Sequence, residues 1–322
     1  MQNLYKLFLE LPQAMTGVEF NAVPLSSTRK DFLARGDDGS PIFLLHDSSE
    51  AKYNPDINFR HLSAQFHVTC NVKTGDVDFR GQFCLVKCDP TIPELHEMFV
   101  RCVSAAIESL PEFCGTSELE SCIFQLLDLF RALSMSNGRQ VSGLWAELFV
   151  IAMSGNIKQA LTLWHEDKFD RFDFSSNKTY LEVKSSVRNI RAHEFTLEQL
   201  HAPSQGNGFV VSILLQPLSG GVSVMQLARE IETMLSGTPS LKQKLWKGIA
   251  MALGSDFSDK LDRHFDLPFA KRSLIIYSMH DIPKPDTPID SRVTSLRFTS
   301  DITDVSSTIL ESSYTGLHRI FR

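Results

Sequence analysis

The sequence lacks the signatures that identify many enzymes at once. It contains no G-x-x-x-x-G-K-[ST] phosphate loop, no G-x-G-x-x-G, no G-x-S-x-G and no H-E-x-x-H. An ATPase, a dinucleotide-dependent enzyme and a serine hydrolase are therefore disfavoured. Apolar runs are also short, since none approaches the roughly 18 to 20 residues that a membrane-spanning helix needs. We therefore expect no spanning helix and no membrane partner.

Cysteine and positive charge are scarce as well. Six cysteines in 322 residues fit a reducing compartment, so we expect a cytoplasmic protein. Cys84 and Cys88 are separated by three residues, but no second pair at ligand spacing follows, which favours buried free thiols over a zinc site. The formal net charge of −6 gives no global attraction to nucleic acid. Any binding to a polyanion therefore requires a local basic patch.

The composition that remains is typical of a folded protein, with 43% hydrophobic and 22% charged residues. A length of 322 residues exceeds one compact core and indicates two or three domains. Changes of pattern predict a strand-rich N-terminal α+β region (1–114), a middle α/β region (115–218) and a C-terminal region of helices followed by strands (219–322). The stretch MQNLYKLFLELPQAM has no small-residue cleavage site and indicates a packed element rather than a signal peptide.

Hydrophobic periodicity predicts the elements within these regions. In the first region, strands over 66–73 and 77–87 form a hairpin around the turn Thr74-Gly75-Asp76. The second region begins with a helix at the capping box Ser117-x-x-Glu120. It continues with a helix over 141–153 and three strands over 160–165, 171–175 and 180–185. A short helix from Thr196 and a strand over 209–215 follow. The third region has helices over 224–235, 240–253 and 256–264, strands over 273–278 and 292–299, and a final helix over 302–312.

One set of polar residues in the middle region points to chemistry. Along 179–186 the side chains alternate, so that Leu181 and Val183 face a core while Glu182 and Lys184 share the other face. Asp173 stands nine residues before Glu182, and a hairpin would bring the two carboxylates together. Converging carboxylates repel unless a cation shares the site, and hard oxygen ligands suit Mg²⁺. Lys184 could then hold the attacking water or stabilise negative charge on a phosphate.

Two more residues extend this set. Glu147 falls within the apolar stripe of Leu144, Leu148 and Ile151, where a carboxylate must be paired, hydrogen-bonded or metal-bound. Gln199 stands at the start of the following short helix, where it would orient substrate or water beside the strand.

Each of these residues also has a purely structural interpretation. Glu182 and Lys184 would be the solvated face of an edge strand, and Asp173 would only initiate a turn. Glu147 would reach solvent from the edge of its stripe, and Gln199 would only complete a helix-capping box. A structure separates these interpretations, because Asp173, Glu182 and Glu147 must converge within several ångströms if they share an ion.

Four short motifs then follow one another in a recognisable order: Gly143-Leu144-Trp145-Ala146-Glu147-Leu148, Phe172-Asp173-Phe174, Leu181-Glu182-Val183-Lys184-Ser185-Ser186 and Phe195-Thr196-Leu197-Glu198-Gln199-Leu200. Together they resemble the PD-(D/E)XK nuclease superfamily. More closely, they are similar to a bacterial family of such proteins associated with restriction and phage-defence genes. Because those proteins have a similar length, the resemblance covers most of the chain, although its motifs lie within 141–216. One departure is Phe172, which stands where many members have a proline.

The resemblance implies a restriction-endonuclease-like α/β core, with a helix, three strands, a helix and a strand around a mixed sheet. It also implies a metal-dependent phosphodiester hydrolase, in the first place a DNA endonuclease. By position, Asp173 and Glu182 would bind Mg²⁺ or Mn²⁺, and Lys184 would assist the nucleophilic water. Glu147 would be a further ligand or position a metal-bound water, and Gln199 would be the accessory polar residue.

The expected partner is DNA, taken as double-stranded, although the residues do not separate it from single-stranded DNA or RNA. Local positive charge is offered by Lys184, Arg188, Arg191, the helix over 241–247 and the pair Lys271-Arg272. The chain has no motor of its own, so the resemblance also implies delivery to DNA by a helicase-like ATPase or a methyltransferase subunit. A homodimer would pair two sites for cutting both strands, although no residue requires one.

Two other function classes stay open. The first is a catalytically silent subunit with a nuclease fold that binds DNA or scaffolds a defence complex. The presence of Asp173, Glu182 and Lys184 together argues against it, because an inactive copy has no reason to keep all three. The second is a soluble interaction protein whose carboxylates are ordinary surface residues.

Overall fold

The structure is a computed structural model of the chain. It describes residues 4–50, 53–75, 77–134, 140–166, 170–176, 178–200, 206–256, 261–286, 292–293 and 295–310. Contacts divide the chain into two compact units. Unit 1 comprises Met1–Asn137 and Gly237–Ser258, and unit 2 comprises Gly138–Ser236 and Asp259–Arg322.

This division differs from the three consecutive regions expected from the sequence. The helix α7 (Pro239–Leu253) returns to unit 1, where it packs against α2 (His96–Ile107) and α3 (Thr116–Ser134). Buried Lys242 on α7 donates to both carboxylate oxygens of Glu108, at 2.7 and 2.9 Å. A change of sequence pattern cannot reveal such a return, because it depends on contacts between segments more than a hundred residues apart.

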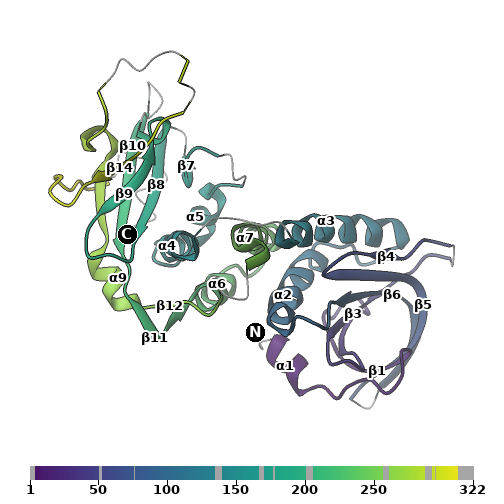
Figure 1. Ribbon diagram of the computed structural model, residues 1–322. Helices are drawn as coiled ribbons and strands as arrows, with labels where there is room; N and C mark the ends of the chain where they lie inside the picture. Colours follow the sequence, from purple (N-terminus) through teal and green to yellow (C-terminus); the bar gives the residue numbers. More distant parts are fainter. Residues whose placement is uncertain are drawn as a thin grey trace. The chain divides into compact units, whose positions relative to one another are not determined.

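Unit 1 contains a β-barrel (Figure 1). Its strands are β1 (Glu19–Pro24), β2 (Phe32–Arg35), β3 (Pro41–His46), β5 (Leu62–Thr74) and β6 (Val77–Cys88), with β4 (Ile57–Asn58) added to β5. The hydrogen-bonded order is β1-β2-β3-β6-β5, and β1 pairs again with β5 in parallel, which closes the sheet on itself. Closure removes the exposed strand edges at which other chains could add.

Side chains alternate along the strands between the inside and the outside of the barrel, and large apolar residues pack on both sides. Phe20, Phe32 and Phe83 belong to the core inside the barrel. On the outer side Phe43 contacts Phe99 of α2, with ring centroids 5.8 Å apart, so the helices cover the barrel. The N-terminal stretch forms α1 (Leu4–Glu10), which buries Phe8, as expected of a packed element, and the turn η1 (Pro93–Leu95) leads into α2.

Unit 2 is built on a four-stranded mixed sheet with the order β13-β10-β8-β7. Its elements are α4 (Val141–Ala152), α5 (Ile157–Leu163), β7 (Phe174–Ser176), β8 (Thr179–Ser186), β9 (Ala192–Thr196), η2 (Glu198–Leu200), β10 (Asn207–Leu214), β11 (Pro217–Ser223), α6 (Val224–Thr233), β12 (His264–Phe265), α9 (Leu267–Ser273), β13 (Ile275–Ser278), η4 (Met279–Asp281) and β14 (Arg297–Asp301). The strands β8 and β10 run parallel, and β7 and β13 run antiparallel to their neighbours. The strand β8 is therefore central rather than an edge.

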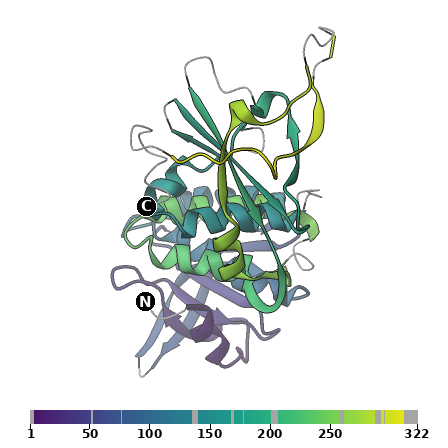
Figure 2. The ribbon, with the colours of Figure 1, turned by 90° about the vertical axis from the view of Figure 1, so that its left-hand side faces the viewer.

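Both faces of this sheet are covered. On one face α4 packs against β8, and α6 packs on α4. On the other face the antiparallel pair β9–β14 places Phe195 and Phe298 against Val210 and Tyr277 of the sheet. Figure 2 shows the teal and green strands of this unit from a second direction. A strand covered on both faces buries its polar side chains, and this decides the environment of Glu182.

The start of unit 2 differs from the sequence prediction. The strand predicted over 160–165 is wrong, because residues 160–163 belong to α5, which is capped at Asn156 and ends at Leu163. Only Trp164 forms an isolated bridge with Phe174. The third strand is β9, which the sequence did not predict. The observed order is two helices, α4 and α5, then β7, β8 and β9, then η2 and β10, and β9 pairs with β14 outside the four-stranded sheet.

The mixed α/β class is thus confirmed, while the restriction-endonuclease-like core stays a prediction. Two further details differ. The helix α3 begins at Thr116 and the carboxylate of Glu118 accepts the N–H of Gly115 at 3.0 Å, in place of the predicted box at Ser117 and Glu120. Residues 302–310 form no helix, and of the predicted helix over 256–264 residues 257–260 lie outside the described residues, while His264 belongs to β12.

The six cysteines are free and buried, as predicted. Burial raises the pKa of Cys70 to about 11 and that of Cys122 to about 12, so these thiols are inert at neutral pH. Within the described ranges, no helix has the length and apolar character to cross a membrane.

Candidate active site

The first residue of the site is Glu147 on α4, which is only 2% exposed. Its Oε2 accepts a hydrogen bond from Trp164 Nε1 at 2.8 Å and lies 3.2 Å from Nε2 of His165. The interpretation of Glu147 as a glutamate that reaches solvent is therefore wrong. A buried carboxylate requires such partners, because burial without them is strongly unfavourable.

Trp164 and His165 reach Glu147 because α5 ends immediately before them. Trp164 adopts an extended conformation, with ψ of 142°, and its ring is 2% exposed. The backbone N–H of His165 donates to the carbonyl of Asp173 at 2.9 Å. This two-residue segment is thereby held between α4 and the start of β7.

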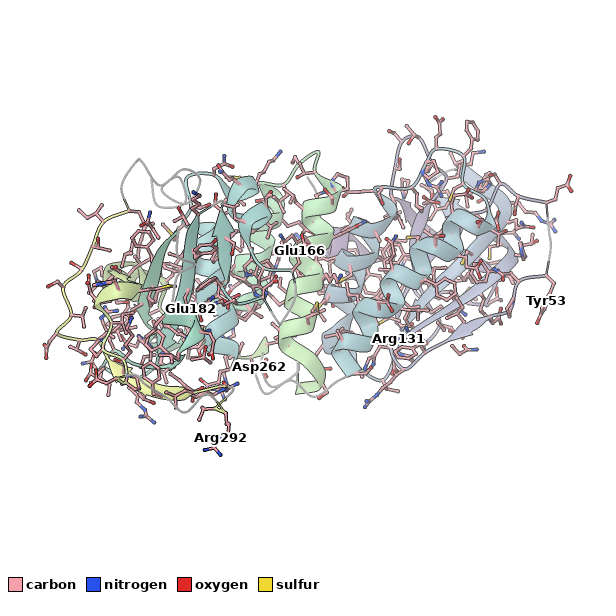
Figure 3. The ribbon with its side chains drawn as sticks, turned by 90° about the horizontal axis from the view of Figure 1, so that it is seen from above. Tyr53, Arg131, Glu166, Glu182, Asp262 and Arg292 are labelled. Carbon is pink, nitrogen blue, oxygen red and sulfur yellow. The ribbon has the colours of Figure 1, made fainter. Side chains whose placement is uncertain are left out.

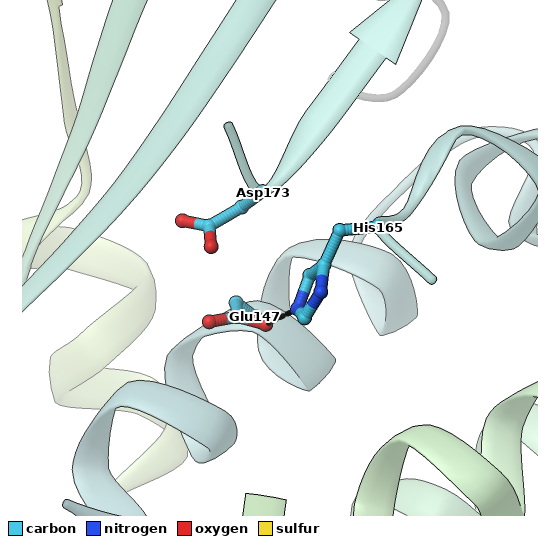
Figure 4. A group of neighbouring side chains, drawn as sticks. All are labelled: Glu147, His165 and Asp173. Atoms are coloured by element: carbon cyan, nitrogen blue, oxygen red, sulfur yellow. Dashed lines mark hydrogen bonds and ion pairs between the residues drawn. The ribbon is translucent and has the colours of Figure 1, made fainter. Parts of the chain in front are cut away.

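Asp173 stands where the pairing of β7 with β8 stops. Phe174 pairs with Leu181, so Asp173 is one step beyond the last registered pair. Its Oδ2 accepts the N–H of Val183 at 2.7 Å and thus occupies the place of a strand carbonyl. One ligand atom from each of Glu147, His165 and Asp173 lies within 4.8 Å of the other two (Figure 4). We call these three residues the carboxylate–histidine group.

A second set, the lysine group, comprises Glu182, Lys184 and Gln199. Glu182 is 4% exposed, and its Oε1 lies 2.9 Å from Lys184 Nζ and accepts from Gln199 Nε2 at 2.7 Å. Lys184 Nζ also donates to Gln199 Oε1 at 3.3 Å. The predicted capping box is confirmed, since Gln199 and Thr196 exchange hydrogen bonds of 3.1 and 3.3 Å. The same amide therefore caps a turn and joins Glu182 to Lys184.

The interpretation of Glu182 and Lys184 as a solvated edge is wrong. They lie on the sheet face that β9 and β14 cover, and Figure 3 labels Glu182 among the strands of unit 2. Leu181 and Val183 are buried on the opposite face, as the alternation predicted.

The structure brings Glu147 and Asp173 together but places Glu182 in the other group. The two groups meet at β8, since Glu182 belongs to one and the adjacent Val183 N–H binds Asp173 of the other. The carboxylate of Glu182 is turned toward Lys184 because that ammonium neutralises it in a buried place. The expected convergence of three carboxylates is thus present for two, and metal binding by Glu182 stays a prediction.

The basic residues expected near DNA differ in exposure. Arg188 is exposed, as are Lys271 and Arg272. Arg191 is 6% exposed and donates to the carbonyl and Oγ of Ser212, each at 2.8 Å, and to the carbonyl of Ser273. Arg191 is therefore a structural residue, not a DNA contact. Lys242 in unit 1 is likewise buried against Glu108, so its helix is not a continuous basic surface.

A buried histidine adjoins the lysine group. His193 Nε2 lies 2.7 Å from Ser212 Oγ, and Ser212 is the register partner of Lys184 on β10. Burial, together with the charges of Lys184 and Arg191, lowers the pKa of His193 to about 4. The imidazole is therefore neutral near pH 7 and adds no charge beside Lys184.

His165 and Trp164 are site residues that the sequence did not reveal. Histidine spacing gave no indication, because the partners of His165 are two carboxylates rather than a second histidine. A signal existed in the adjacent pair Trp164-His165, which offers two N–H donors directly after an apolar segment. The wrong strand assigned over 160–165 concealed it.

Comparison with protein families shows to which family the chain belongs. A family model described as "Putative PD-(D/E)XK family member, (DUF4420)" matches residues 8–303. The chain belongs to this family. The match runs through both units, so the barrel and the mixed sheet are parts of one DUF4420 architecture. No curated protein and no solved structure matches the chain.

The residues present fit the divalent metal ion that a PD-(D/E)XK description implies. Two carboxylates and one imidazole within 4.8 Å supply negative charge and donor atoms that such ions accept. Trp164 fixes one oxygen of Glu147, in the manner of the hydrogen bonds that orient ligands around metal sites.

Proposed function

We propose that the protein is a metal-dependent phosphodiester hydrolase, and specifically a DNA endonuclease of a bacterial restriction or phage-defence system. The observation that supports this proposal most strongly is the carboxylate–histidine group and its link to the lysine group through β8, where the N–H of Val183 binds Asp173 and the adjacent Glu182 contacts Lys184. Membership of a family described as PD-(D/E)XK supports the same reaction class.

In this proposal Glu147, His165 and Asp173 hold the metal ion, which would lower the pKa of a bound water and neutralise charge on the phosphate. Glu182 and Gln199 position Lys184, whose Nζ they contact at 2.9 and 3.3 Å. An ammonium fixed in advance stabilises developing negative charge without first reorganising its surroundings. Lys184 Nζ also lies 5.2 Å from the centre of the Phe195 ring, which restricts it further.

DNA would be contacted by exposed cations around this site. Arg188 follows the end of β8 by two residues and is exposed. Because the chain carries a net charge of −6, binding by the isolated protein should be weak and sensitive to salt. Delivery by a helicase-like ATPase or methyltransferase subunit is part of the proposal for this reason.

The test is cleavage of supercoiled plasmid with Mg²⁺ or Mn²⁺ by the wild type, Asp173→Asn and Lys184→Met. We expect metal-dependent nicking that each substitution lowers by about 100-fold or more, because each removes charge from the reacting centre. His280→Asn is the matched control, since the His280 side chain is 92% exposed and belongs to neither group. Cleavage that survives both site substitutions would show that the proposed site is not responsible.

One observation favours the alternative of a catalytically silent subunit. Lys184 Nζ lies 2.9 Å from Oε1 of Glu182, so the ammonium is already neutralised by a protein carboxylate rather than left for a phosphate. A silent subunit would bind DNA without cutting it under any metal. A gel-shift assay and the cleavage assay on the same preparation separate the two functions. A silent subunit should shift the plasmid and leave it uncut, whereas the proposed nuclease should also cut it once its partner is supplied.

A further inference from the structure

The carboxylate–histidine group contains a nitrogen donor already placed at ligand distance from an oxygen donor. Nε2 of His165 lies 3.2 Å from Oε2 of Glu147. Two ligand atoms that are each about 2.1 Å from one ion lie about 3 Å apart when they subtend a right angle. The Glu147–His165 pair therefore has the separation of neighbouring ligands, and a carboxylate oxygen of Asp173 lies within 4.8 Å of a ligand atom of each of these two residues.

Nitrogen in the donor set changes which ion the group should prefer. Mg²⁺ takes oxygen ligands in a strict octahedron and keeps several waters. Imidazole suits first-row transition ions, and Mn²⁺ accepts carboxylate and imidazole together. We propose that His165 gives this site a preference for Mn²⁺ over Mg²⁺, with Glu147 and Asp173 as the accompanying oxygen ligands. This inference rests on the proposed function only in taking the group as its metal site.

The surroundings of the group support a ligand set that is held in place. Trp164 donates to Oε2 of Glu147 at 2.8 Å, and the N–H of His165 donates to the carbonyl of Asp173 at 2.9 Å. The N–H of Val183 fixes Oδ2 of Asp173 at 2.7 Å. Each of the three residues is thus hydrogen-bonded to another segment of unit 2. These bonds restrict the movement of the side chains, so a water molecule would not easily replace the imidazole nitrogen as a ligand.

The competing explanation is structural, with His165 serving only as a hydrogen-bond partner that makes the burial of Glu147 tolerable. Under that explanation an amide at position 165 replaces the imidazole without changing metal preference. His165→Asn separates the two, because asparagine keeps a neutral side chain that can form hydrogen bonds but removes the imidazole nitrogen that would bind the ion. His165→Ala removes both functions.

The experiment is calorimetric titration of the chelator-treated full chain with MnCl₂ and with MgCl₂, with bound Mn²⁺ counted independently by electron paramagnetic resonance. The wild type should bind Mn²⁺ at least about tenfold more tightly than Mg²⁺. His165→Asn should lose about 10- to 100-fold in Mn²⁺ affinity, with a change of less than about threefold for Mg²⁺. His280→Asn, which also removes an imidazole, should behave as the wild type.

The proposal is overturned if the wild type binds Mg²⁺ as tightly as Mn²⁺, or if His165→Asn keeps the Mn²⁺ preference. Thermal melting of each variant establishes that it is folded, and His165→Ala serves if His165→Asn is not. Failure of the nuclease proposal is distinguishable, because Mn²⁺ binding through His165 without plasmid cleavage would leave this inference standing. Cleavage supported equally by both ions, with unaltered binding in His165→Asn, would refute the inference alone.

Discussion

Replacing Gln199 by alanine should destabilise unit 2 more than the loss of a helix cap can explain. The amide of Gln199 donates to Glu182 at 2.7 Å and accepts from the N–H of Thr196 at 3.1 Å. Loss of this bond from the N–H of Thr196 costs about 1 kcal/mol. Loss of a hydrogen bond to a buried carboxylate costs about 1.5–3 kcal/mol more. Gln199→Ala should therefore lower the free energy of unfolding by about 2.5–4 kcal/mol.

The chain provides a matched control in a second capping box. Ser223 and Gln226 exchange bonds of 2.7 and 3.2 Å at the start of α6, and Gln226 is exposed. Gln226→Ala removes the equivalent bond from the N–H of Ser223 without touching the lysine group, so it should lower the free energy of unfolding by only about 1 kcal/mol. Urea unfolding of both variants measures the difference. Equal losses would refute the claim that Gln199 supports Glu182.

The same pair separates a positioning role from a structural one. Gln199→Ala leaves Lys184 with fewer fixed partners, so metal-dependent cleavage should fall by about tenfold or more, in kcat rather than KM. Gln226→Ala should cleave as the wild type does. A Gln199→Ala enzyme of unchanged kcat would mean that Glu182 alone places Lys184.

Three further changes have outcomes that the structure predicts. Glu108→Ala should lower the free energy of unfolding by about 3 kcal/mol, because it leaves the buried ammonium of Lys242 unpaired. Lys242→Met fills the same space without charge, so it should lower the free energy of unfolding by less than about 1 kcal/mol in the same urea assay. The pKa of His193 is lowered from 6.5 to about 4, so the unfolded chain binds the extra proton between these values and wild-type stability should fall by about 3 kcal/mol as the pH is lowered from 6.5 to 4. His193→Gln should lack that component, and identical pH profiles of the two proteins would contradict the assignment. Arg188→Ala should weaken DNA binding similarly for all sequences and reduce the slope of log affinity against log salt by about 1, as measured by fluorescence anisotropy.

The sequence predicted those features that depend on local periodicity. The hairpin of β5 and β6, the helix α4 and the strands β8 and β10 follow from alternating or helical spacing, and all are present. The opposite faces of Leu181 and Glu182 were predictable for the same reason. The two-unit grouping was not, because the return of α7 to α2 and the closure of β1 on β5 are long-range pairings without a local pattern.

Within the candidate site, too, some features follow from the local sequence pattern and others depend on long-range contacts. The buried position of Glu147 was readable from its apolar stripe, and its need for a partner follows from the unfavourable burial of a carboxylate. Which partner it has depends on where α5 ends, since one more helical residue would carry Trp164 and His165 away from α4. The segment 160–165 is too short and apolar for periodicity to separate helix from strand, and a strand would have sent alternate side chains to opposite faces. A single misassigned element therefore hid the contact of Trp164 and His165 with Glu147.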